Sequence, residues 1–309
     1  MYKKCNAEQF SGLVNDTEVL ISLCLGKVLQ VKQSAICELR DVIYGSYFSS
    51  NLQDCNQWVF VTSGHDNLGS PVTSSRGVND TERMQCFMDI LEHDNTKRYY
   101  VSQHRSNFHH KKLSFIPIGL GTPPKFKLRL TKTQWVEVLS ELSSEMAKSC
   151  SRASSSDSEW LCPLRLFSYN FDVRASKMSS INRVSQAKGI LQLTNSMQLL
   201  PVKNEYGCFS GREVVARNAY SVFVFSPRGT HYDCYRHWEA LLSGSIPIKD
   251  YHHTLIGLFS GLPTVTISSN WRDLRWDSLR ENLSSILEIS NPKYEKLTMD
   301  YWVQRVTEK

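Results

Sequence analysis

A strand–turn–helix–strand pattern at residues 221–248 constrains the fold of this chain more than any other segment. The segment reads SVFVFSPRGTHYDCYRHWEALLSGSIPI: an apolar run, a polar turn with Pro227 and Gly229, a stretch of helical period, and a second apolar run. Two strands joined through a helix form the unit from which parallel sheets are built. The segment therefore predicts an α/β protein with parallel strands.

The same alternation continues along most of the chain. Strand-like runs are predicted at residues 58–64, 97–103, 112–121, 164–171, 220–226, 246–248 and 262–267. Helices are predicted from the spacing of apolar residues at 81–93, 131–149, 175–192, 234–243, 271–289 and 292–306. The segment between residues 193 and 217 has no clear apolar period.

A change in composition divides the chain. Its 309 residues are enough for two domains of ordinary size. The stretch SCSRASSSDSE at 149–159 is rich in serine and nearly free of apolar side chains, as exposed connectors are. We therefore expect a first domain at 1–150, a serine-rich linker at 151–160 and a second domain at 161–309. The first 50 residues or so receive no assigned role.

Composition and charge exclude several classes of protein. Hydrophobic residues make up 41% and charged residues 21% of the chain, as in globular proteins. The net charge of +6 suits an anionic ligand, but no stripe of basic residues or ladder of aromatic residues predicts nucleic acid binding. The apolar stretch at 18–31 is too short to span a membrane and contains charged residues.

Cysteine use and the N-terminus bear on location. The nine cysteines form no Cys-x-x-Cys pair and are expected to be thiols in a reducing compartment. The alternative, an oxidising compartment, rests on three glycosylation sequons at Asn15, Asn79 and Asn282. The N-terminus lacks the apolar core of a signal peptide. We expect a soluble, cytoplasmic chain, or one in the Golgi lumen or at a membrane if an anchor is missing from it.

The polar turn after the run at 220–226 is the candidate site. Ligands of open α/β sheets bind beyond the carboxyl ends of strands, and the helix start that follows offers free N–H groups to a phosphate. Arg228 and Arg236 add fixed positive charge, and Glu239 lies one helical turn beyond Arg236, placed to bind ribose hydroxyls. The residues predicted to bind the donor are Ser226, Pro227, Arg228, Gly229, His231, Arg236 and Glu239. The alternative is an Arg236–Glu239 surface ion pair beside an ordinary turn.

These residues resemble the signature of exostosin-like glycosyltransferases, including the ribitol-phosphate xylosyltransferase-like members. That family has a strand, a Ser-Pro-x-Gly turn, a helix of Arg-x-x-Glu-Ala type and then Gly-x-Ile-Pro. Each element is present here, within residues 226–247. Weaker matches follow in the order of the family at 61–67, 114–120, 167–171 and 261–274.

The resemblance implies a GT-B architecture, in which two Rossmann-like domains face each other across a cleft. The second domain would hold a nucleotide sugar, such as UDP-xylose, and the first a glycan or glycoconjugate acceptor. The implied activity is the transfer of the sugar to an acceptor hydroxyl. The alternative is a catalytically silent protein that binds nucleotide sugars or carbohydrates on the same fold. An oxidoreductase is not predicted, because no Gly-x-Gly-x-x-Gly motif opens a strand–helix turn.

The expected chemistry needs neither a metal nor a cofactor besides the donor. Arg228, Arg236 and the helix start would stabilise the charge that grows on the leaving diphosphate. The sequence contains no isolated Asp-x-Asp motif of the kind that binds manganese. An inverting transfer requires a base on the acceptor, for which Asp66 is the first candidate and His65 the second. The alternative is that His65 and Asp66 only form a turn or cap a helix.

Overall fold

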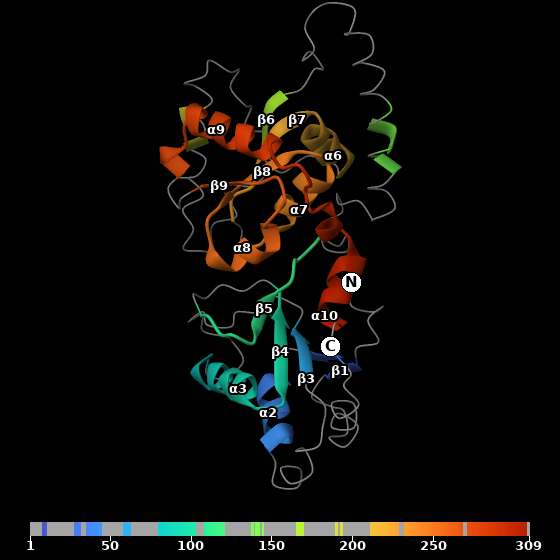
Figure 1. The fold of residues 1–309 in the computed structure, drawn as a ribbon, viewed down its shortest axis with the longest axis vertical. Coiled ribbons are helices and arrows are strands. Elements are labelled where there is room, and N and C mark those ends of the chain that lie inside the picture. The colour runs from blue at the N-terminus through green and yellow to red at the C-terminus, as the bar shows by residue number, and fades with distance from the viewer. Residues whose placement is uncertain are drawn as a thin grey trace, which may run out of the picture.

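The chain folds around two parallel sheets, one from each half of the sequence (Figure 1). The structure, a computed structural model, describes residues 8–10, 28–31, 35–44, 58–62, 80–102, 108–120, 137–138, 140–142, 144, 165–169, 189–190, 192–193, 211–228, 232–267 and 271–307. The prediction of an α/β protein with two parallel sheets is confirmed. The predicted linker at 151–160 lies outside the described residues.

The first sheet has the sequential strand order β1-β2-β3-β4-β5. Its strands are β1 (Glu8–Phe10), β2 (Val28–Val31), β3 (Trp58–Thr62), β4 (Thr96–Val101) and β5 (Leu113–Phe115). Helices α2 (Ile36–Tyr44) and α3 (Asp80–Glu92) both pack on the face that carries Phe60 and Tyr99. Right-handed crossovers between neighbouring parallel strands put the connecting helices on one face, which explains this arrangement.

The other face of the first sheet is covered by the last helix of the chain, α10 (Met299–Thr307). Val306 and Trp302 of α10 pack against Val61 and Tyr100 of the sheet, and Tyr100 Oη donates a hydrogen bond of 2.8 Å to Arg305 O. Figure 1 shows α10 next to β3 and β4. The segment at the end of the predicted second domain thus completes the layers of the first sheet. The single helix predicted at 292–306 is two helices, η6 (Tyr294–Leu297) and α10, separated at Thr298.

The second sheet has the order β6-β7-β8-β9. Its elements are β6 (Arg165–Tyr169), α6 (Gly211–Ala219), β7 (Ser221–Phe225), α7 (Tyr235–Leu242), β8 (Ile246–Asp250), α8 (His253–Phe259), β9 (Val265–Ile267), η5 (Trp271–Asp273) and α9 (Trp276–Leu287). Leu279 of α9 packs in one core cluster with Phe223 and Phe225. Helices α7 and α8 form a separate cluster with Phe115, the last residue of β5, and Ile118, which follows β5. We call each sheet, together with the helices that pack on it, a unit. Helices α7 and α8 therefore lie where the two units meet (Figure 1).

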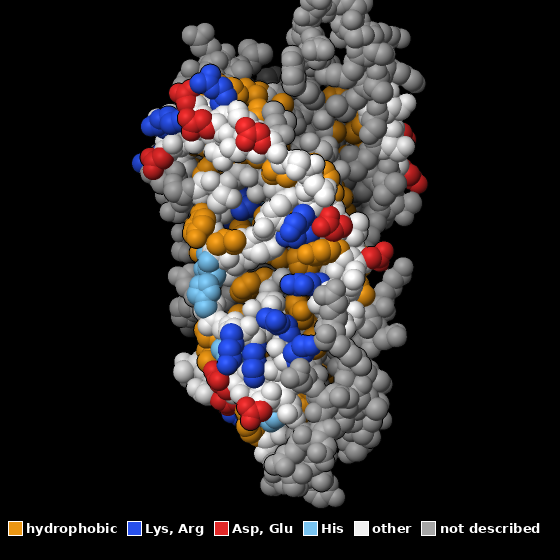
Figure 2. Space-filling view, in the orientation of Figure 1, with side chains coloured by type: hydrophobic (Ala, Val, Ile, Leu, Met, Phe, Trp, Pro, Cys, Tyr) orange, Lys and Arg blue, Asp and Glu red, His pale blue; other side chains and the backbone are white. Residues whose placement is uncertain are grey.

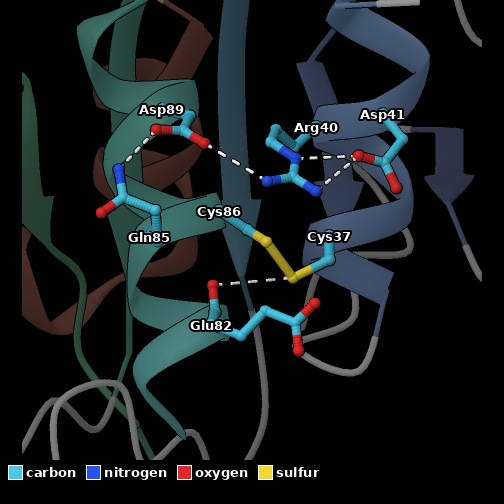
Figure 3. Close-up of a disulfide and its surroundings, with 7 residues drawn as sticks. All are labelled: Cys37, Arg40, Asp41, Glu82, Gln85, Cys86 and Asp89. Carbon is cyan, nitrogen blue, oxygen red and sulfur yellow. Dashed lines mark hydrogen bonds and ion pairs between the residues drawn. A yellow bond between two sulfur atoms is a disulfide. The ribbon is translucent and has the colours of Figure 1, made fainter. Parts of the chain in front are cut away.

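A disulfide between Cys37 and Cys86 joins α2 to α3. Figure 3 shows this bond beside Arg40, which bonds to Asp41 at 2.8 Å and pairs with Asp89 at 3.5 Å. The expectation that the cysteines are all thiols is therefore wrong for this pair. Spacing does not predict this pairing, because the two cysteines are 49 residues apart and meet only when the two helices pack side by side. Cys234 is a buried free thiol.

Within the described part of the chain, no helix is both long and apolar enough to cross a bilayer.

Candidate functional site

The predicted donor turn lies at the carboxyl edge of the second sheet, directly after β7. Ser226 N donates to Ile248 O at 2.9 Å, which extends the pairing with β8 by one bond. Arg228 N donates to Asp250 Oδ2 at 2.6 Å. The turn is therefore held by the end of the neighbouring strand, and its geometry does not depend on a ligand.

Asp250 is the main support of this turn, and sequence reasoning missed it. Its second oxygen, Oδ1, accepts a hydrogen bond of 2.7 Å from Trp271 Nε1. The side chain is buried, and a buried carboxylate needs such donors to offset the loss of water. The available signal was an aspartate two residues after the strand predicted at 246–248.

Asp233 joins the start of α7 to the first unit. Its Oδ1 accepts from Trp238 Nε1 at 2.8 Å, and its Oδ2 accepts from the backbone N–H of Ile118 at 2.7 Å. Ile118 lies in the loop after β5, where Gly119 has a φ of 69° that favours glycine. A side chain of the second unit thus fixes a loop of the first.

His237 lies behind the turn and is fully buried. Its Nε2 bonds to Ser226 O at 2.9 Å, and its Nδ1 is 3.5 Å from Asp233 Oδ1. Burial lowers the pKa of His237, but Cys234 and Asp233 outweigh that effect and raise the pKa to about 9. His237 therefore links the carbonyl of the turn, through Nε2, to the backbone N–H of Cys234 at the start of α7, which donates to Nδ1 at 3.4 Å.

Lys249 is the fourth charged residue under the turn and is 3% exposed. Its Nζ donates to Thr266 Oγ1 at 2.8 Å and lies 5.0 Å from the centre of the Phe259 ring. Burial lowers the pKa of Lys249 to about 8, although Asp233 and Asp250 favour its charged form. We refer to Asp233, His237, Lys249 and Asp250 as the polar hub.

The structure places some of the predicted donor ligands at this turn. Ser226, Pro227 and Arg228 form it, whereas Gly229 and His231 lie outside the described residues. Ser226 Oγ is buried and has no hydrogen-bond partner among the residues that are described.

Arg236 and Glu239 lie on α7, as the spacing predicts. Arg236 is half-buried, and Glu239 is only 8% exposed. The burial of Glu239 disagrees with the alternative of an exposed surface ion pair. The two predicted bases, Asp66 and His65, lie outside the described residues, and β3 ends at Thr62, shortly before them.

The side chain of Arg228 begins a stack of planar groups. Its guanidinium lies 4.8 Å from the centre of the Tyr232 ring, and that ring stacks on His252 at 3.4 Å between centroids. The centre of the His253 ring lies 4.1 Å from that of His252 and 3.7 Å from that of His109, which belongs to the first unit. Stacking uses the face of the guanidinium and leaves its N–H groups pointing outward in the plane, where they can bind an oxyanion.

In the described residues, no group of three or more histidine, cysteine or carboxylate side chains is arranged to hold a metal ion. Neither protein-family models nor curated proteins match this chain. The function is therefore inferred from the residues of the site.

Proposed function

We propose that this chain is a glycosyltransferase that moves a sugar from a nucleotide-sugar donor, such as UDP-xylose, to a hydroxyl of a glycan or glycoconjugate. The observation that carries the proposal is the placement of the signature segment. Its turn lies at the carboxyl edge of a parallel sheet, where such sheets bind ligands, and Asp250 fixes the turn from the adjacent strand. In this proposal the two units form a GT-B arrangement, with the donor on the second and the acceptor on the first.

The donor diphosphate would bind at the turn and the start of α7. The in-plane N–H groups of Arg228 and the guanidinium of Arg236 would stabilise the negative charge that grows as the anomeric C–O bond breaks. The carboxylate of Glu239, on α7, would bind the ribose hydroxyls. Preformed arginine contacts would replace a divalent cation, so the proposed transfer is independent of metal.

The acceptor hydroxyl would lose its proton to a base on the first unit as it attacks the anomeric carbon from the face opposite the diphosphate. Asp66 is the proposed base, with His65 as the second choice, because both come shortly after Thr62, the last residue of β3, in the sequence. This geometry inverts the anomeric configuration. The Cys37–Cys86 disulfide supports an oxidising compartment such as the Golgi lumen for this reaction.

The proposal is tested with a panel of UDP-, GDP- and CMP-sugars. One of them should raise the melting temperature, because a ligand at 100 times its Kd stabilises a protein by about 2.7 kcal/mol. That donor should then support transfer to a glycan acceptor, and the transfer should survive EDTA. If EDTA abolishes transfer and Mn²⁺ restores it, the metal-free mechanism is wrong.

A variant of Glu239 links this binding to the site. Glu239→Gln should weaken UDP binding by about 1–3 kcal/mol in calorimetry, whereas Glu281→Gln, an exposed change on α9, should leave it unchanged. If both variants bind UDP with the same affinity, Glu239 does not contact the donor. A donor that binds but is transferred to no acceptor in a broad panel would favour the silent binding protein instead.

A further inference from the structure

A pocket of about 620 Å³ lies where the two units meet, away from the donor turn. Strands β4 and β5 of the first sheet form one wall, and α8, η6 and α10 form the others. Its volume is in the range of pockets that hold small-molecule ligands. We call it the junction pocket.

The lining of the junction pocket is strongly basic. Five of its residues are cations, and none of its lining residues carries a carboxylate. The cations are Lys97, Arg98, Lys293, Lys296 and Arg305. Figure 2 shows lysine and arginine side chains gathered across the middle of this face, over the region of β4, β5 and α10. Like charges held around one cavity favour the binding of an anion.

A β-bulge helps to explain why two neighbouring residues of β4 line the same pocket. In a regular strand, Lys97 and Arg98 would point to opposite faces of the sheet. Between Trp58 and Val59, however, β3 advances by one residue where β4 advances by two, so β4 contains an extra residue. Bulges redirect side chains in this way, and both cations reach the pocket. Arg98 Nη1 is fixed by a hydrogen bond of 3.1 Å to Lys111 O.

The five cations do not have the same role. Lys296 Nζ donates to the carbonyl oxygens of Gly257 and Ser260 at 2.9 and 2.7 Å, so this ammonium ties η6 to the end of α8. Burial lowers the pKa of Lys296, and the charges of Lys293 and Arg305 lower it further, partly offset by Glu295. Lys293 and Arg305 therefore repel the ammonium of Lys296.

Lys97 and Lys293 are the cations left to bind a ligand directly. Neither forms an ion pair with any residue that the structure describes, and both line the pocket. Lys97 is half-buried, whereas Lys293 is exposed at the rim. An anion bound to them would gain charge-assisted hydrogen bonds.

Aromatic rings supply the apolar part of the wall. Tyr100, Tyr301 and Trp302 line the pocket, and the polar ends of two of them are already engaged. Tyr100 Oη bonds to Arg305 O, and Trp302 Nε1 donates to Lys296 O at 2.7 Å. Their ring faces are therefore suited to the uncharged part of a ligand.

We propose that the junction pocket binds a phosphorylated small molecule with at least two negative charges. Phosphate is favoured because one group carries −1.5 to −2 charges near pH 7 and three acceptor oxygens, which matches several cations around a small volume. The ligand would contact β4 and β5 of one unit and α8 of the other, and so hold the two units together. This proposal does not depend on the proposed transferase activity.

Calorimetry of the full chain with inorganic pyrophosphate tests the proposal. Wild type should bind pyrophosphate, and the double variant Lys97→Gln, Lys293→Gln should bind it at least about 10-fold more weakly. Arg280→Gln, which removes the same charge from an exposed position on α9, should bind like wild type. Unchanged circular dichroism and melting temperature in the double variant would show that it is folded. Absence of binding by wild type would overturn the proposal.

Two further measurements identify the binding site and the class of ligand. The donor turn is also expected to attract phosphate, so Arg236→Ala is measured beside the double variant. If Arg236→Ala abolishes pyrophosphate binding and the double variant does not, the anion occupies the donor turn and the junction pocket proposal fails. Citrate should bind at least about 10-fold more weakly than pyrophosphate. Equal binding of citrate would overturn the assignment to phosphate.

Discussion

The two sheets of this molecule are supported in different ways. The helices of the first sheet are tied by a disulfide, and its other face is closed by α10 from the far end of the chain. The second sheet depends at its carboxyl edge on the polar hub, whose four charged residues are buried under the donor turn. In the second unit, the residues that support the edge of the sheet therefore also hold the candidate site.

This difference indicates where a change should affect stability and where it should affect function. Loss of the disulfide acts on helices that lie on the face of the first sheet. Loss of a hub residue acts on the turn that is proposed to hold the donor diphosphate. A change in the polar hub should therefore reduce both stability and donor binding. Loss of the disulfide should reduce stability and leave donor binding unchanged.

The largest expected effect separates catalysis in the first unit from binding in the second. Asp66→Asn should reduce turnover by about 10²–10⁴-fold and leave UDP-sugar affinity nearly intact, because a base acts on the acceptor alone. Arg236→Ala should reduce both, because the diphosphate is bound before and during bond breaking. Steady-state kinetics and calorimetry measure the two quantities. Full turnover in Asp66→Asn would move the search for the base to His65.

The next effect tests the hub as a support. Asp250→Ala leaves the N–H of Arg228 and the indole N–H of Trp271 buried without their acceptor, and each should cost about 1–3 kcal/mol of stability. We expect a total loss of about 2–6 kcal/mol in urea unfolding, together with weaker donor binding. Asp277→Ala, at an exposed position on α9, should lose less than about 1 kcal/mol. Similar losses in the two variants would contradict the role given to Asp250.

Most of the strands and the signature helix could be predicted from the sequence. Elements such as β3, β7 and α7 were found because an apolar run of the right period ends in a polar turn. The sequence predicts no helix at α2, α6 or α8 and no strand at β1 or β2. Helix α8 has only seven residues and begins at His253, where a pair of histidines indicated no period.

The hub and the junction pocket could not be predicted, because both depend on contacts between distant parts of the chain. Asp250 is explained by Trp271, 21 residues later, and an aspartate after a strand otherwise indicates only a turn. Lys97 and Lys293 line one pocket because the chain returns from the second sheet to the first. Spacing in a sequence contains no signal for such a return.

The disulfide gives the corresponding test of the first unit. Replacing Cys37 and Cys86 with serine should lower the free energy of unfolding by about 2–4 kcal/mol, because the bond closes a loop of 49 residues in the unfolded chain. Affinity for the UDP-sugar should stay as in wild type, since the bond lies between α2 and α3. Urea unfolding and calorimetry measure the two. A loss of donor affinity as large as that of Asp250→Ala would show that the two units are not independent.

The smallest effect is a pH dependence that belongs to the hub. The pKa of His237 is raised from 6.5 to about 9, so the stability that its proton contributes is complete below pH 6.5 and is lost as the pH rises towards 9. The pKa of Lys249 is lowered from 10.5 to about 8, so burial of its charge destabilises the fold below pH 8, and this penalty disappears as the pH rises further.

Between pH 6.5 and 8 the loss of the His237 proton should lower the free energy of unfolding by at most about 2 kcal/mol, since one proton changes stability by at most about 1.4 kcal/mol per pH unit. Ionisation of Cys234 offsets part of this fall, because burial raises the pKa of this thiol but His237 outweighs burial and lowers it. Between pH 8 and 9 the two residues oppose each other, and the curve should flatten. Lys249→Met should keep the fall below pH 8 and extend it to pH 9, because the opposing gain is removed. Urea unfolding at half-unit steps measures the curve. If the curve of Lys249→Met also flattens above pH 8, the flattening does not come from Lys249. The pKa of Lys249 would then not be lowered in the folded protein.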